Sequence, residues 1–124
     1  MITPADLAMT PDNALRLSAR RSNDYDFGVW FWGDAIALDG LLDAAELLGD
    51  EKSLHQAGRA FERWAARPLS WADHLTPGSA LLRYGELAGE SWPLERAQEL
   101  AAYLGSVPRS SGAPLYRPDL PEYR

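Results

Sequence analysis

The chain has 124 residues, with 18 acidic and 12 basic side chains and a formal net charge of −6. This length suits one domain, and the acidic balance argues against nucleic acid and anionic membranes as partners. It contains no cysteine, which excludes disulfides and thiolate metal sites, and its two histidines lie far apart, so we expect no metal or other cofactor.

No apolar stretch approaches the ~18 residues of a membrane span, and the first residues lack the pattern of a signal peptide. We therefore expect a cytoplasmic protein. The first predicted element is a lead-in helix over residues 11–21, followed by a loop. Two helical hairpins follow, over 29–66 and 77–104. The proline-rich tail 105–124 is predicted to be a loop, with a short extended piece at 114–117.

Each predicted hairpin consists of two helices whose apolar residues recur at helical spacing. The hairpin helices are expected at 29–48, 51–66, 77–88 and 93–104. The apolar stripes expected to face the core include Ile36, Leu38, Leu41, Leu42, Leu54, Ala57, Phe61, Trp64, Leu81, Leu82, Leu87, Leu94, Leu100 and Ala101.

The two hairpins are related by an internal repeat. A shift of 40 positions places residues 41–68 on 81–108 with eight identities over 28 aligned positions, among them Leu42/Leu82, Gly49/Gly89 and Leu54/Leu94. Each copy reads as helix, glycine-acid turn, helix and proline. The predicted fold class is therefore all-α, an array of antiparallel hairpins. The period of about 40 residues suits either armadillo or HEAT units or the hairpins of an α/α toroid.

Chemically distinctive residues precede the fourth predicted helix, in the stretch "SWADHLTPGSALLRYGELAG". Thr76 is a candidate cap and Pro77 suits the first turn, while Asp73 and His74 come directly before this start. The equivalent place one repeat earlier is occupied by Asp34. In a toroid the inner helices begin at a shared mouth, so we expect these carboxylates to face a common cleft.

The stretches "WFWGDAIALDGLLDAAELLGDEKSL", "WADHLTPGSALLRYGELAG" and "YLGSVPRSSGAPLYRPDLPEYR" together resemble the N-terminal part of the unsaturated glucuronyl and rhamnogalacturonyl hydrolases, glycoside hydrolase families 88 and 105. The resemblance implies part of a six-hairpin (α/α)6 toroid. It also implies a substrate, an oligosaccharide that ends in an unsaturated uronic acid, and hydrolysis by hydration of the 4,5 double bond. That is general acid/base chemistry without a metal.

The resemblance also assigns roles to individual residues. Asp73 matches a family aspartate that contacts the substrate ring, and it is the candidate catalytic residue. Trp30 and Trp32 match aromatic positions where a sugar stacks, and Asp34 and His74 lie beside these positions as candidate substrate-binding residues. The alternatives are structural, since Asp73 also suits a helix start and His74 suits a loop residue bonded to backbone.

The family's second aspartate, the general acid/base, lies beyond a segment like "PLYRPDLPEYR", and Asp119 does not match its pattern. A closed ring at the observed period needs about 240 residues. We therefore expect a fragment that is inactive by itself, with its truncated edge as a candidate surface for self-association. The alternative is a non-catalytic helical-repeat module that binds carbohydrate or protein.

Overall fold

The computed structural model describes residues 10–27, 32–69, 77–107, 109–110 and 112–114. These residues form five helices and one pair of two-residue strands, so the predicted all-α class is confirmed. The elements are α1 Pro11–Asn23, α2 Trp32–Leu48, α3 Glu51–Ala65, α4 Gly78–Ala88, α5 Trp92–Ser106, β1 Arg109–Ser110 and β2 Ala113–Pro114. No helix in these ranges is both long and apolar enough to cross a bilayer.

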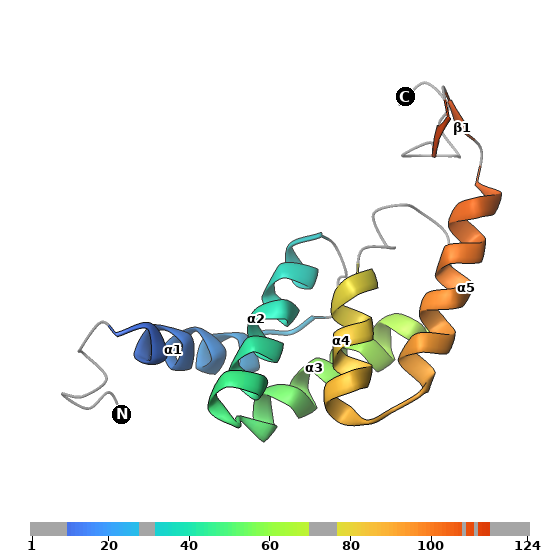
Figure 1. Ribbon diagram of the computed structural model, residues 1–124. Helices are drawn as coiled ribbons and strands as arrows, with labels where there is room; N and C mark the ends of the chain where they lie inside the picture. Colours follow the sequence, from blue (N-terminus) through green and yellow to red (C-terminus); the bar gives the residue numbers. More distant parts are fainter. Residues whose placement is uncertain (1–9, 28–31, 70–76, 108, 111, 115–124) are drawn as a thin grey trace.

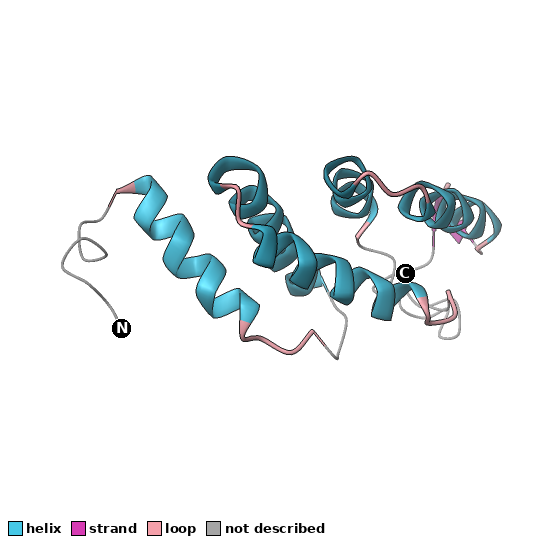
Figure 2. Ribbon diagram, turned by 90° about the horizontal axis from the view of Figure 1, so that it is seen from below, coloured by secondary structure: helices cyan, strands magenta, loops and turns pink. Residues whose placement is uncertain are grey.

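The helices follow one another in an open array (Figure 1). The helices α2 and α3 pack together, as do α4 and α5, and α1 lies against α2 and α3. The helices α1 and α5 therefore lie at opposite ends of the array, as both views show (Figures 1 and 2). The strands β1 and β2 pair antiparallel directly after α5. This pairing begins earlier than the extended piece predicted at 114–117, of which 115–117 lie outside the described residues.

The turns that join the helices of each pair are alike, as the repeat predicts. Gly49 and Gly89, equivalent under the 40-residue shift, both have left-handed backbone, with φ of 65° and 68°. Glycine tolerates this conformation at the end of a helix without the steric cost of a Cβ. After Gly49 the side chain of Asp50 caps α3 by accepting a hydrogen bond from the Ser53 backbone N–H at 3.2 Å.

One predicted helix start needs correction, and a second cannot be compared. The helix α4 begins at Gly78, so Pro77 is its N-cap rather than part of its first turn, and no side chain caps this end. The predicted cap Thr76 lies outside the described residues. The helix α2 begins at Trp32, and residues 29–31 of its predicted start also lie outside the described part of the chain.

The core runs through all five helices. Its buried apolar side chains are Ala19, Phe27, Leu38, Leu41, Leu42, Ala44, Ala57, Ala60, Phe61, Trp64, Ala80, Leu81, Tyr84 and Leu100. The predicted core face of α3 is confirmed, since Ala57, Phe61 and Trp64 are buried there. Ile36 on α2, Leu82 on α4, and Leu94 and Ala101 on α5 were also expected to face the core, but all four are exposed. Helical spacing places them beside an apolar stripe, but no helix in the described part of the chain covers them.

The two helix pairs meet where α3 and α4 come close together. The Tyr84 ring lies 5.5 Å from that of Phe61, measured between centroids. At Gly58, a Cβ would come within 2.5 Å of the Tyr84 hydroxyl oxygen and within 2.8 Å of ring carbon Cζ. The pKa of Tyr84 is raised to about 12, mainly because the phenol is buried and to a smaller extent because the negatively charged Glu90 lies nearby. The phenol therefore stays protonated at neutral pH and donates a 3.3 Å hydrogen bond to Glu90.

Charged side chains bridge the same two pairs at the surface. The Arg83 guanidinium of α4 lies 2.7 Å from Asp43 and 2.8 Å from Glu46, both on α2. All three side chains are partly exposed, so each ion pair contributes only a fraction of a kcal/mol. Arg96 of α5 donates to the Arg67 carbonyl at 2.7 Å and lies over the Trp64 ring at 5.6 Å. These contacts orient the second pair on the first, and the buried contact between Phe61 and Tyr84 adds about 0.5–1.5 kcal/mol beyond the burial of the two rings.

We predict that Gly58→Ala destabilises the fold by about 1–3 kcal/mol, because the added methyl overlaps the Tyr84 ring. Gly40→Ala is the matched control, since nothing lies within 4 Å of a Cβ added there. That change should stabilise α2 by about 0.5–1 kcal/mol through helix propensity. Urea unfolding followed by circular dichroism measures both effects. An equal gain in stability at both positions would contradict the close approach of α3 and α4.

Candidate functional site

Of the five site residues predicted from the sequence, the structure describes the side chain of one. Asp73, His74 and Trp30 lie outside the described residues, and Trp32 begins α2 with its side chain outside the described part. Asp34 lies in the first turn of α2 and is only 2% exposed. A carboxylate in the first turn of a helix is favoured by the helix dipole.

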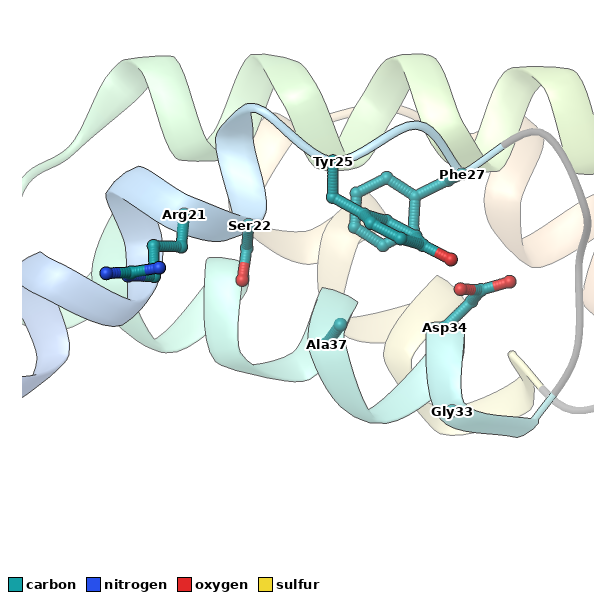
Figure 3. Close-up of a pocket in the computed structure, with 7 residues that line it drawn as sticks. All are labelled: Arg21, Ser22, Tyr25, Phe27, Gly33, Asp34 and Ala37. Atoms are coloured by element: carbon teal, nitrogen blue, oxygen red, sulfur yellow. The ribbon is translucent and has the colours of Figure 1, made fainter.

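Asp34 lines a pocket of about 330 Å³ between the start of α2 and the end of α1. Its other lining residues are Arg21, Ser22, Tyr25, Phe27, Gly33 and Ala37. Figure 3 shows the Asp34 carboxylate and the Tyr25 hydroxyl directed toward each other, whereas the Arg21 guanidinium points away from Asp34. The pocket therefore presents a carboxylate and a phenol from two different elements to the same small space.

The pocket wall is formed by two aromatic residues. From the sequence, these residues were expected only to lie in a loop. Tyr25 and Phe27 have ring centroids 4.9 Å apart and an interplanar angle of 80°, an edge-to-face pair. Phe27 is buried and anchors the loop, while Tyr25 is half exposed. The sequence gave one hint of this wall, which is that two aromatic residues lie two positions apart in a short acidic loop. Helical periodicity gave no reason to place that loop against α2.

The loop that carries these rings is fixed to α3. The Gln56 side-chain amide donates to the Tyr25 carbonyl at 3.4 Å, and the Arg63 guanidinium donates to Asp26 at 3.3 Å. The loop also continues from the end of α1, where the Tyr25 N–H donates to the Ser22 carbonyl at 3.2 Å. The Tyr25 side of the pocket is thus held from both α1 and α3.

A buried polar network joins α1 to the start of α3 behind this loop. The Asn23 side-chain amide donates to the Ser53 hydroxyl oxygen at 3.0 Å and to the Ala19 carbonyl at 2.9 Å. The Ser53 hydroxyl in turn donates to Asp50 at 2.7 Å. Since Ser53 is fully buried, its hydroxyl bonds set the position of the α1 end, and with it the position of Tyr25.

The chemistry available in the pocket is that of a small polar ligand with an apolar face. A carboxylate accepts hydrogen bonds from hydroxyl groups, a phenol both donates and accepts, and an exposed ring stacks on a flat apolar surface. Within the described part of the chain, no three His, Cys, Asp or Glu side chains gather as a metal site would require. A sugar ring combines the hydroxyls and the apolar face that this lining suits.

Comparisons with models of known protein families, with curated proteins and with solved structures gave no match.

We predict that Ser53→Ala destabilises the protein by about 1–3 kcal/mol, because it removes the hydroxyl group that accepts from the Asn23 amide and donates to the Asp50 carboxylate. Ser18→Ala, at an exposed position of α1, is the control and should change stability by less than about 0.5 kcal/mol. Thermal and urea unfolding give both values. Equal effects for the two serines would mean that the buried network does not hold α1 on α3.

Proposed function

We propose that the chain is the substrate-binding part of an unsaturated uronyl hydrolase and that the Asp34 pocket receives the terminal uronyl ring. The observation that supports this most directly is the buried Asp34 carboxylate facing the Tyr25 hydroxyl beneath an aromatic wall. The family resemblance draws attention to the same end of α2, because it assigns a sugar-stacking role to Trp30 and Trp32. Under this proposal the helix pairs are successive hairpins of an α/α toroid.

The roles divide between the pocket and the residues that the resemblance assigns. Asp34 accepts hydrogen bonds from ring hydroxyls, and Tyr25 contacts the ring through its exposed face and hydroxyl. Asp73 is the proposed catalytic carboxylate. His74, Trp30 and Trp32 complete the contacts to the sugar.

The proposed reaction is hydration of an enol ether. A carboxylic acid delivers a proton to C4 of the unsaturated ring, and a water activated by a carboxylate adds its oxygen to C5. The resulting hemiketal opens to a ketone and an aldehyde, and the bond from the former anomeric carbon to the leaving sugar breaks. One water is consumed for each bond cleaved, and no electrons are transferred. This differs from the two-carboxylate displacement at the anomeric carbon of ordinary glycosidases.

We predict that an unsaturated uronyl disaccharide binds the chain more tightly than its saturated counterpart. Asp34→Asn should weaken this binding by about 10- to 100-fold, the value of a hydrogen bond to a charged group. Asp12→Asn, on the exposed surface of α1, is the matched control and should bind as the unmodified chain does. Circular dichroism first confirms that each variant is folded. Calorimetric titration with each disaccharide then measures the dissociation constants.

Binding that does not saturate, or an Asp34→Asn variant that binds as tightly as the Asp12→Asn control, would contradict this site. Saturable binding of the two disaccharides with equal affinity would favour the second candidate function, a helical-repeat binding module. The observation that favours such a module is the open array of helices with an uncovered face on α4 and α5.

We predict no turnover by this chain alone, since no residue in its sequence matches the family's second aspartate, the general acid/base. The measurement is the loss of enol-ether absorbance on incubation with the unsaturated disaccharide. Turnover that disappears in Asp73→Asn would show that the prediction of inactivity is wrong and that the assignment of Asp73 is right. Turnover that persists in Asp73→Asn would count against both.

A further inference from the structure

The Asp34 pocket has side chains of opposite charge at its two ends. Among its described lining residues, Asp34 and Arg21 are the two that carry charged groups. Asp34 lies in the first turn of α2, whereas Arg21 lies in the last turn of α1. Figure 3 shows Ser22, Tyr25 and Ala37 between them. The pocket therefore presents an anion and a cation to different parts of one ligand.

The polar side chains at the α1 end of the pocket are not engaged by the protein. In the described part of the chain, neither the Arg21 guanidinium nor the Ser22 hydroxyl makes a hydrogen bond or an ion pair. The neighbouring acidic side chains do not compete inside the pocket. Asp26 is paired with Arg63 at 3.3 Å, and Asp24 does not line the pocket. The donors of Arg21 and Ser22 are thus available to a ligand.

A basic residue at this position also has a structural explanation. A cation in the last turn of a helix is favoured by the helix dipole. Arg20 lies in the same turn of α1 and is exposed as well, but it does not line the pocket. A comparison of Arg20 with Arg21 therefore separates the role at the helix end from a role in binding.

The charge of a uronyl ring restricts how it can enter this pocket. The ring carries its own carboxylate, which Asp34 would repel at close range. The ring can therefore approach Asp34 only with its hydroxyl groups, and its carboxylate must point away from Asp34. Arg21 and Ser22 lie at the end toward which it then points. A guanidinium and a hydroxyl both donate hydrogen bonds to a carboxylate.

We propose that Arg21, assisted by Ser22, binds the carboxylate of the uronyl ring and so determines the orientation of the ring in the Asp34 pocket. This inference rests on the proposed function and adds to it a residue that selects acidic over neutral sugars. The Arg21 guanidinium points away from Asp34 in Figure 3. Exposed side chains change rotamer within nanoseconds, so the guanidinium turns toward the carboxylate as the ligand enters.

The test uses an unsaturated uronyl disaccharide with a neutral second sugar, and the methyl ester of the same disaccharide, which has no negative charge. Calorimetric titration gives the dissociation constants of both ligands for the unmodified chain, Arg21→Gln and Arg20→Gln. Arg21→Gln should weaken binding of the acid by about 3- to 10-fold, as for a partly exposed ionic hydrogen bond, and leave the ester unchanged. Arg20→Gln should change neither. Circular dichroism confirms that each variant is folded.

The salt dependence provides a second measurement, which a purely structural role of Arg21 would not change. Added salt screens the attraction between the guanidinium and the carboxylate. The affinity of the unmodified chain for the acid should therefore fall more steeply with salt than that of Arg21→Gln. Equal salt dependence of the two proteins would contradict the proposal.

Two further results would overturn the role of Arg21. Equal losses of affinity in Arg21→Gln and Arg20→Gln would assign both residues to the helix end. A loss in Arg21→Gln that is as large for the ester as for the acid would show that the carboxylate is not the partner. In both cases the proposed function still stands if Asp34→Asn weakens binding of the acid. If neither ligand binds the unmodified chain, the proposed function fails and the role of Arg21 fails with it.

Discussion

The arrangement of the described helices depends on the close approach of α3 to Tyr84. Glycine at position 58 leaves room for the Tyr84 ring, and a side chain there would meet that ring. Tyr84 then packs near Phe61 on one side and bonds to Glu90 on the other. This contact and the packing of α4 against α2 together place the second helix pair on the first. The Arg83 ion pairs lie largely at the surface and add less to stability, whereas Arg96 is mostly buried where it bonds to the Arg67 carbonyl.

The position of α3 also determines the geometry of the candidate site, which lies on the side of α3 that faces away from α4. Because α3 is held between α4 and the α1 loop, its Gln56, Ser53 and Arg63 can position the segment that carries Tyr25 and Phe27. Asp34 comes from a different helix, α2, and meets this segment only when α1, α2 and α3 are packed together. The pocket is thus a product of tertiary structure, which explains why its aromatic wall has no signature in any single helix.

Helix positions were predictable because each helix carries a local signal. Gly49 and Gly89 mark the turns, and buried residues such as Phe61 recur at helical spacing. The burial of individual leucines was not predictable, since Leu42 and Leu82 occupy equivalent positions and differ only in whether another helix follows beside them. The predicted role of Asp34 placed it at a helix start, but its burial and its position facing Tyr25 depend on a loop whose path the sequence pattern does not define.

We have proposed that a uronyl ring binds between Asp34 and the loop that carries Tyr25. The most direct measurement is a heteronuclear NMR titration of the isotopically labelled chain with the unsaturated disaccharide. We expect saturable shifts of the backbone amides of Tyr25, Phe27, Gly33 and Asp34, with little change in α5. Shifts confined to α4 and α5, or no shifts at all at saturating ligand, would contradict it.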